Sequence, residues 1–198
     1  MTKKVGWGLY DYSKKDSIIN NIQSIFTQKE CDIINNYGLN HNDLKDGAVR
    51  DGYIDHSTRN SKIVMLPSND EEIQWVFRRV TDAIISMNKE FYEYDLNQLE
   101  LLQFTSYDSQ SKGFYCPHID IKLIDSLSRK LSFSIQLSPP DSYTGGDLLF
   151  NCGGPPNIAS KEQGIGVFFP SWVLHEVTPV RTGIRNSLVG WVLGPHFK

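Results

Sequence analysis

Two residues that can bind a metal lie two positions apart in a segment with the character of a β-strand. The segment is GFYCPHIDI, and within it one apolar residue separates His118 from Asp120. Because successive side chains of a strand point to opposite faces, His118 and Asp120 are expected to share one face, with Cys116 on the same side. A single His-x-Asp pair often arises by chance, so a metal site needs a third ligand.

His175 is the candidate for that third ligand. It begins a later strand-like run, after the aromatic-rich segment from Gly166 to Trp172. Two imidazoles and one carboxylate on one face of an octahedral metal leave positions open for other ligands, an arrangement typical of non-haem Fe(II) sites. Zinc accepts the same donors, but a hydrolytic zinc site needs a nearby general base, and the sequence singles out none. The pattern favours iron over zinc.

The composition predicts one folded domain over residues 1–198. Hydrophobic residues make up 39% of the chain and charged residues 22%, which excludes a largely disordered protein. The formal net charge of −3 gives no basic excess for binding phosphates, so we expect no nucleic-acid partner. Residues 1–15 lack the apolar stretch of a secretory signal, and no run approaches the ~18 apolar residues of a membrane span. We therefore expect no membrane partner.

The cysteines bear on the cellular compartment. Cys31, Cys116 and Cys152 are odd in number, widely spaced and without a CxxC pair, so they indicate neither a disulfide framework nor a cysteine zinc site. A reducing, cytoplasmic location fits this pattern best. The sequence leaves the oligomeric state open.

Two helices are predicted in the first half of the chain. Thr27 and Glu30 form a capping-box pattern for a helix over about residues 27–37, which Gly38 would end. A longer helix is expected to open at Ser68 or Asn69, with three acidic residues in its first turn. Its apolar residues recur at helical spacing and should face a sheet: Ile73, Val76, Val80, Ile84, Met87 and Phe91.

From Leu99 onward the chain is a series of short apolar runs separated by turn residues. Seven strands at this spacing, without helices between them, are typical of an antiparallel sandwich or barrel. The runs are LELLQFTSY, GFYCPHIDI, KLSFSIQLS, GDLLFN, GIGVFFPSW, LHEVTPV and NSLVGWVL.

The chain also carries a longer set of motifs in a fixed order: Tyr107, His118-x-Asp120, Tyr143-Thr-Gly-Gly-Asp147, Phe169-Pro-Ser171, His175-x-Val-Thr-Pro-Val180, Gly183-x-Arg185-x-Ser187 and Trp191. This set resembles the Fe(II)/2-oxoglutarate-dependent oxygenases, and within them the prolyl 4-hydroxylase-like group. The helix motif T-x-x-E-C-x-x-I-I and Arg59-Asn-Ser61 before the strand-like KIVML are similar to that group as well, so the resemblance covers roughly residues 25–194.

The resemblance implies an α+β, mainly β fold. The fold would be a double-stranded β-helix, also called a jelly-roll or cupin-like barrel, with the N-terminal helices packed on one sheet. Residues 1–98 would supply helical support and a substrate loop, and residues 99–194 the catalytic barrel core.

The resemblance also implies a role for each matching residue. His118, Asp120 and His175 would bind Fe(II), and Arg185 with Ser187 would hold the distal carboxylate of 2-oxoglutarate. An arginine suits this task because its planar fork stays charged and forms two parallel hydrogen bonds to a carboxylate. Tyr107 matches a tyrosine that reaches the oxoacid, with a plain sheet aromatic as the competing interpretation. A second tyrosine of the group falls at Gln136, a departure that leaves an amide as donor.

An enzyme of this type would convert 2-oxoglutarate and O2 into succinate and CO2 while it hydroxylates an unactivated C–H bond, with ascorbate as a reductant. A peptide or protein substrate is expected, with a peptidyl proline as the target. The polar segment Asn40–Asn60 would form a mobile substrate loop that carries Arg50, Tyr53 and Arg59. Trp191 is a further substrate candidate.

Two other functions stay open. The same core could hydroxylate a free amino acid or another small molecule, because only the substrate-entry loops discriminate between these. A cupin-like binding module without turnover is the other alternative, although such a module has no need of Arg185 opposite the metal.

Overall fold

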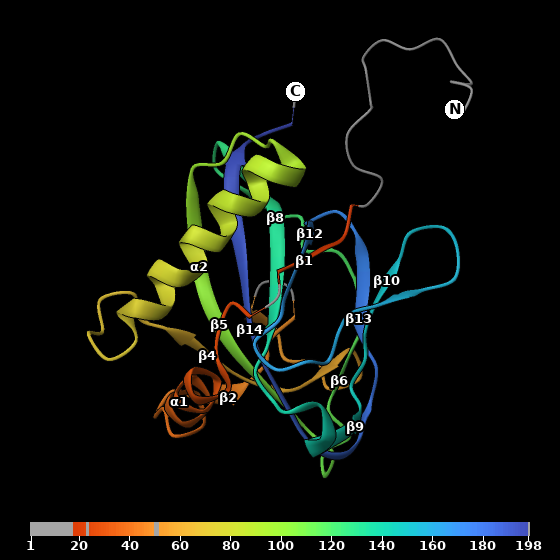
Figure 1. The fold of residues 1–198 in the computed structure, drawn as a ribbon. Helices are drawn as coiled ribbons and strands as arrows, with labels where there is room; N and C mark the ends of the chain where they lie inside the picture. The colour runs from red at the N-terminus through yellow and green to blue at the C-terminus, as the bar shows by residue number, and fades with distance from the viewer. Residues whose placement is uncertain (1–17, 23, 50–51, 198) are drawn as a thin grey trace, which may run out of the picture.

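The computed structural model describes residues 18–22, 24–49 and 52–197. Two antiparallel sheets face each other, and two helices, α1 (Gln28–Leu39) and α2 (Gln74–Met87), cover the outer face of the larger sheet (Figure 1). This arrangement places one layer of side chains between the helices and the sheet and another between the two sheets.

The larger sheet combines strands from both halves of the chain. Its order is β1-β12-β8-β14-β5-β4-β2, with β7 paired to β8 and β9 paired to β14. The strands are β1 (Asn20–Ile22), β2 (Lys45–Asp46), β4 (Lys62–Leu66), β5 (Gln98–Asp108), β7 (Leu123–Ile124), β8 (Leu127–Gln136), β9 (Tyr143–Gly145), β12 (Gly166–Pro170) and β14 (Val180–Pro195).

The smaller sheet has the order β11-β10-β13-β6-β3. Its strands are β3 (Arg59–Asn60), β6 (Phe114–His118), β10 (Leu148–Asn151), β11 (Asn157–Ile158) and β13 (Leu174–Val177). Each of the seven predicted runs contains a strand, so the expectation of antiparallel strands from Leu99 onward is confirmed, and KIVML forms β4. The first 98 residues contribute β1 to β4 to the sheets in addition to the helices.

Helix α1 begins at the predicted capping box. The Glu30 backbone N–H donates to Thr27 Oγ1, and the Thr27 backbone N–H donates to the Glu30 carboxylate at 2.7 Å. The helix continues to Leu39, so the prediction that Gly38 ends it is wrong. Gly38 instead packs on the ring of Phe104, where an added Cβ would lie 2.4 Å from Cγ. The glycine permits close packing of the helix on the sheet.

Helix α2 begins later than predicted, at Gln74 and not at Ser68 or Asn69. The acidic residues before it lie in turns, where Asp70 accepts a hydrogen bond of 2.6 Å from the Tyr37 hydroxyl of α1. The predicted apolar stripe is confirmed, since Ile73 and four residues of α2 are buried in the helix-facing core. A π-helical turn, η2 (Asn88–Tyr92), extends the helix and brings Phe91 against the same core.

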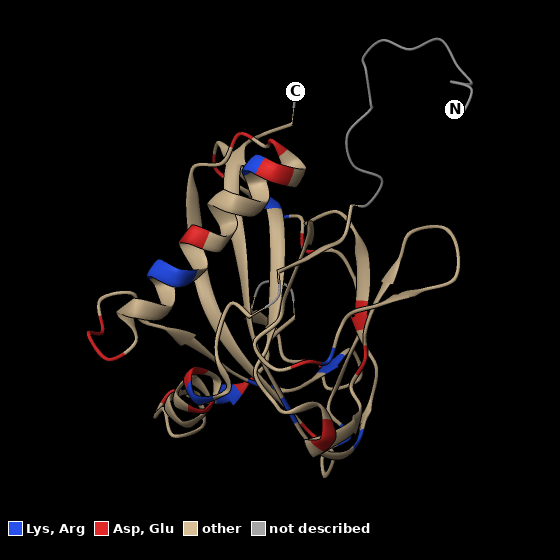
Figure 2. Cartoon of the chain, in the orientation of Figure 1, with Lys and Arg blue, Asp and Glu red and all other residues tan. Residues whose placement is uncertain are grey.

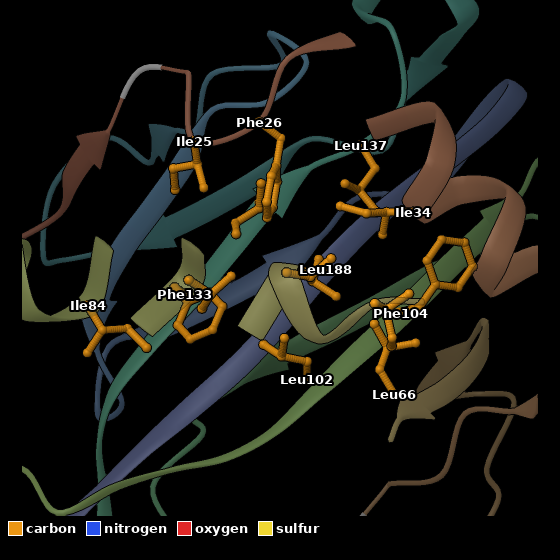
Figure 3. Packing of buried hydrophobic residues seen from close by; sticks show 14 of the residues in the cluster. Ile25, Phe26, Ile34, Leu66, Ile84, Leu102, Phe104, Phe133, Leu137 and Leu188 are labelled. Atoms are coloured by element: carbon orange, nitrogen blue, oxygen red, sulfur yellow. The ribbon is translucent and has the colours of Figure 1, made fainter. Parts of the chain in front are cut away.

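The core between helices and sheet follows the alternation of the strands. Figure 3 shows Phe133 of β8, Leu102 and Phe104 of β5 and Leu188 of β14 packed together with Ile84 of α2. The next residues along these strands point to the other side, toward the smaller sheet. The large sheet therefore has an apolar outer face, packed against the helices, and an inner face on which polar side chains can lie.

The segment Asn40–Asn60 is more ordered than the sequence suggests. It contains β2 and β3 at its two ends, and Asp55 accepts hydrogen bonds from Ser57 and Thr58. These hydrogen bonds lower the pKa of Asp55 to about 2. The expectation of a loop without its own structure is therefore wrong for these parts, while Arg50 lies outside the described residues.

Basic and acidic residues are interspersed along both helices, so neither helix presents a uniformly basic surface (Figure 2). A search of the described helices for one that is long and apolar enough to cross a bilayer finds none.

Candidate active site

Three metal-capable side chains meet at one end of the smaller sheet. His118 is the last residue of β6, and His175 of β13 is its direct cross-strand partner. Asp120 lies just beyond the end of β6, not within a strand as expected, and its backbone N–H donates to the Ser171 carbonyl. The ligand atoms of the three residues all lie within 4.8 Å of one another.

The two imidazoles are oriented by hydrogen bonds behind them. His118 Nδ1 lies 2.8 Å from the Cys116 carbonyl, and His175 Nδ1 lies 2.9 Å from the Val173 carbonyl. Each Nδ1 must carry its proton to donate to a carbonyl, which leaves the Nε2 lone pair for a metal. The Nε2 atoms lie 3.8 Å and 3.5 Å from the carboxylate oxygens of Asp120.

The electrostatics of the three residues also fit a cation. Burial, followed by the neighbouring His175, lowers the pKa of His118 to about 4, so its ring is neutral at pH 7. Asp120 is only 9% exposed, and its Oδ2 atom is buried without a hydrogen-bond partner in the described part of the chain. A divalent metal would satisfy that oxygen, and two nitrogens with one carboxylate oxygen are a suitable donor set for Fe(II).

The three residues line a cavity of about 530 Å³ between the two sheets. This volume is in the range of small-molecule sites. The chemically active lining residues are Arg59, Tyr107, Tyr115, His118, Asp120, Arg129, His175, Arg185, Ser187 and Trp191.

Arg185 is the buried cation of this cavity. It is 4% exposed, its Nη1 lies 3.4 Å from Ser187 Oγ, and its guanidinium lies 5.5 Å from the centre of the Tyr107 ring. Arg185 pairs across the strands with Tyr107, and Ser187 pairs with Gln136, so the register brings the four residues together. Within the described ranges no carboxylate forms an ion pair with Arg185. A buried, unpaired guanidinium is a strong recognition element for a carboxylate ligand.

Tyr143, which the sequence alone does not predict as a binding residue, forms a hydrogen bond with Arg185. The Gln136 amide donates to its hydroxyl at 3.0 Å. Burial raises the pKa of Tyr143, and the charge of Arg185 and a hydrogen bond with it act against that rise. Gly146 follows with φ of +60°, and an added Cβ there would lie 3.0 Å from Arg185 Cδ. The Tyr-Thr-Gly-Gly motif was the available signal, since its glycines let Tyr143 and Arg185 approach.

Tyr115 is a second residue that was missed. Its ring stacks on the His118 imidazole with 3.6 Å between centroids, and the Arg59 guanidinium lies 4.7 Å from the centre of the Tyr115 ring. Arg59 thus lines the cavity near a metal-capable histidine, and its role as a substrate contact stays a prediction.

The other two substrate candidates differ in their placement. Trp191 lines the cavity beneath the Arg129 guanidinium, which lies 4.0 Å from its ring centre and makes two hydrogen bonds to Glu100. Tyr53 is 71% exposed and does not line the cavity. The role of Tyr53 as a substrate contact on the loop therefore stays a prediction.

Comparison with known proteins supports this arrangement. Residues 102–193 match the family model of the 2OG-Fe(II) oxygenase superfamily. A PKHD-type hydroxylase of Maricaulis maris is 38% identical over 78 residues, which are 39% of this chain and 36% of that relative. A PKHD-type hydroxylase of Prochlorococcus marinus is 28% identical over 85% of this chain and 75% of its own length. The chain thus spans little more than a third of the length of the first of these relatives.

The fold is that of solved prolyl hydroxylases. A prolyl hydroxylase from Trichoplax adhaerens, in complex with a peptide fragment of the hypoxia inducible factor oxygen degradation domain, superimposes with a TM-score of 0.74. The similarity covers 89% of this chain and 84% of that one at 17% identity. The expected double-stranded β-helix is confirmed.

Proposed function

We propose that the chain belongs to the 2OG-Fe(II) oxygenase superfamily, whose model matches residues 102–193, and that it is a hydroxylase that uses Fe(II), 2-oxoglutarate and O2. One observation carries the proposal: a His-Asp-His cluster and the buried, unpaired Arg185 line the same cavity. The first suits a divalent metal and the second a carboxylate, which are the two anchors that a chelating oxoacid requires.

His118, Asp120 and His175 would hold the metal. The Cys116 and Val173 carbonyls keep both Nε2 atoms directed at it, so the ligands are oriented before the metal arrives. When bound with 2-oxoglutarate and O2, Fe(II) supplies oxidative decarboxylation of the oxoacid coupled to hydroxylation of a C–H bond.

Arg185 would bind the distal carboxylate of 2-oxoglutarate. Ser187 lies beside the guanidinium, and the Tyr143 hydroxyl, held by the Gln136 amide, is a further donor at that end. Tyr107 would cover the guanidinium with its ring. A bidentate arginine contact together with a hydroxyl fixes both the position and the orientation of a dicarboxylate.

The proposed substrate is a peptide or protein with a proline as the hydroxylated residue. The Trichoplax enzyme, a prolyl hydroxylase solved with a bound peptide fragment, supports this class. In this chain, Trp191 and Arg129 would form the wall that contacts the substrate, because Glu100 fixes the guanidinium over the indole. Hydroxylation of a free amino acid is the alternative.

We also propose the remaining attributes of the protein from its sequence. Residues 1–198 would form one oxygenase domain, with residues 99–194 as the barrel core. A cytoplasmic location is supported by Cys31, Cys116 and Cys152, which are all free thiols.

The test is succinate production from 2-oxoglutarate. The purified protein is incubated with Fe(II), ascorbate and O2, with proline-rich peptides, with free amino acids or with neither, and the products are analysed by mass spectrometry. A gain of one oxygen on a peptidyl proline together with succinate is expected. Hydroxylation of a free amino acid alone would establish the alternative, and no metal-dependent succinate under any condition would contradict the proposed function.

A further inference from the structure

The charges around the cavity do not balance once the proposed ligands are assigned. Among the residues that the structure describes, four cationic residues line it, Arg59, Lys122, Arg129 and Arg185, against one anionic residue, Asp120. Under the proposed function Asp120 binds the metal and Arg185 the oxoacid. Arg129 is neutralised by Glu100, with N–O distances of 2.6 Å and 2.8 Å. Arg59 and Lys122 form no ion pair with a carboxylate in the described part of the chain.

Arg59 is the buried member of this pair. It is 6% exposed, its Nε donates to Ser61 Oγ at 2.8 Å, and its Nη1 donates to the Ala48 carbonyl at 3.1 Å. Both acceptors are neutral, and no carboxylate of the described residues forms an ion pair with it. A guanidinium has five N–H donors, so these two contacts leave donors that face the cavity. Burying a cation is unfavourable unless an anion accompanies it.

The surrounding chain holds the guanidinium in place. An added Cβ on Gly47 would lie 2.7 Å from Arg59 Nε, so the glycine provides the space that the side chain occupies. Arg59 also lies against the Tyr115 ring, and that ring stacks on His118. The cation is therefore fixed close to His118. Lys122, which is exposed, is a second positive charge on the cavity lining.

We propose that Arg59 binds a carboxylate of the substrate, so that the enzyme hydroxylates a residue next to an acidic group. The carboxylate could belong to an acidic side chain of a peptide or to a free amino acid. The inference rests on the proposed function in one respect, because the oxoacid at Arg185 is what leaves Arg59 as the remaining buried cation.

The test compares carboxylate probes with their amides. The protein is loaded with Mn(II) and 2-oxoglutarate, and binding is measured by titration calorimetry. One pair is L-proline and L-prolinamide. The other pairs are acetylated and amidated alanine peptides with a central proline, in which a glutamate at one of the neighbouring positions is exchanged for glutamine.

The expected result is a carboxylate probe that binds about 10- to 100-fold more tightly than its amide, as for a hydrogen bond to a charged group. Arg59→Gln should abolish this ratio, and Arg59→Lys should keep part of it. Arg78→Gln, a change of an exposed arginine on α2, serves as the matched control and should leave the ratio unchanged. Tighter binding of L-proline than of L-prolinamide would identify the substrate as a free amino acid. Tighter binding of the glutamate peptides than of the glutamine peptides would identify it as an acidic peptide.

Two results would overturn the inference. One is that the unaltered protein binds acid and amide probes equally, or binds no carboxylate probe measurably. This result does not depend on the folding of any variant. The other is a ratio that persists in Arg59→Gln. A failure of the proposed function gives a different result. Carboxylate-selective binding without metal-dependent succinate would support the role of Arg59 and contradict the oxygenase activity. Succinate production without carboxylate selectivity would support the oxygenase activity and contradict the role of Arg59.

Discussion

The two faces of the large sheet have opposite compositions although they belong to the same strands. In β8, Leu131, Phe133 and Ile135 point to the helices and are fully buried among other apolar side chains. The residues between them, Ser132 and Ser134, followed by Gln136, point toward the smaller sheet. β14 repeats the pattern, with Leu188 and Val192 in the helix-facing core and Arg185, Ser187 and Trp191 on the cavity.

The difference in composition assigns stability to the helix-facing side of the sheet and ligand binding to the inner side. The helix-facing layer buries apolar surface without polar groups that need partners, so it can supply most of the free energy of folding. The inner layer contains Arg185 and Asp120, whose burial is unfavourable until ligands arrive. Substitutions on the two faces should therefore change different measurements, and each prediction below tests that separation.

The largest effect is expected from Asp120→Ala on the inner face. Loss of a metal ligand should reduce metal-dependent turnover by more than the about 10- to 100-fold typical of residues that only support a ligand. Succinate release measures this, and the melting temperature of the metal-free protein should not fall. Asp82→Ala, at an exposed position of α2, is the control. Full activity of Asp120→Ala would show that the Asp120 carboxylate is not a metal ligand.

Arg185→Ala should weaken 2-oxoglutarate binding strongly. Removing one partner of a buried charged pair costs about 3–5 kcal/mol, which corresponds to at least about a hundredfold in affinity. Calorimetric titration of the Mn(II)-loaded protein with 2-oxoglutarate measures the change. An unchanged dissociation constant would mean that the oxoacid is held elsewhere.

Phe133→Ala is the counterpart on the helix-facing side. The ring is fully buried beside Gly190, where an added Cβ would lie 2.4 Å from Phe133 Cζ. The free energy of unfolding should fall by about 3–5 kcal/mol, measured by denaturant titration. Affinities of the folded protein for Mn(II) and 2-oxoglutarate should stay the same, and Leu101→Ala, at an exposed position of β5, should change neither quantity. A loss of ligand affinity in Phe133→Ala would show that the two faces are coupled.

Tyr143→Phe should have a smaller effect, since it removes the hydroxyl that contacts Arg185 and is proposed as a further donor to the oxoacid. A neutral hydrogen bond contributes about 0.5–1.5 kcal/mol, so 2-oxoglutarate should bind up to about tenfold more weakly. Burial raises the pKa of Tyr143 above the ordinary value, so the hydroxyl stays protonated and the difference should persist up to about pH 9. An affinity equal to that of the unaltered protein would exclude the hydroxyl as a ligand group.

Thr27→Ala should give the smallest effect and touch stability alone. Loss of the N-cap of α1 costs about 1 kcal/mol. The Thr27 backbone N–H and, at 3.0 Å, the Thr27 hydroxyl donate to Glu30 and lower the pKa of that carboxyl, and Thr27→Ala removes only the part due to the hydroxyl. That part of the stability is present above the ordinary pKa of Glu30 and is lost as pH falls through the lowered value. Acid titration of the stability of both proteins measures this, and the difference between them should shrink at low pH. A change in ligand affinity would contradict the separation of the faces.

The period of the strands explains what could be predicted from the sequence. Alternation predicts His118 and Asp120 on one side without knowledge of the partner strand, and the two side chains do meet although Asp120 lies beyond the end of β6. Other features depend on residues that are distant in the sequence. The sequence predicts Asp70 in a first helical turn because its hydrogen bond with Tyr37 depends on the fold. It predicts Gly38 as a helix end because the contact of Gly38 is with Phe104, 66 positions further along the chain.

The site shows the same limit. The departure at Gln136 was visible, but its partner Tyr143 comes from β9, and only the fold brings the amide and the hydroxyl together. Tyr53 was selected for its type within a polar segment, and type alone does not determine on which side of a loop a side chain points.

The most direct test of the account is a crystal structure of the protein with Mn(II) and 2-oxoglutarate. The account predicts one metal bound by Nε2 of His118, Nε2 of His175 and the carboxylate of Asp120, with the distal carboxylate of the oxoacid at Arg185. A metal bound outside the three side chains, or an oxoacid whose distal carboxylate does not contact Arg185, would contradict it.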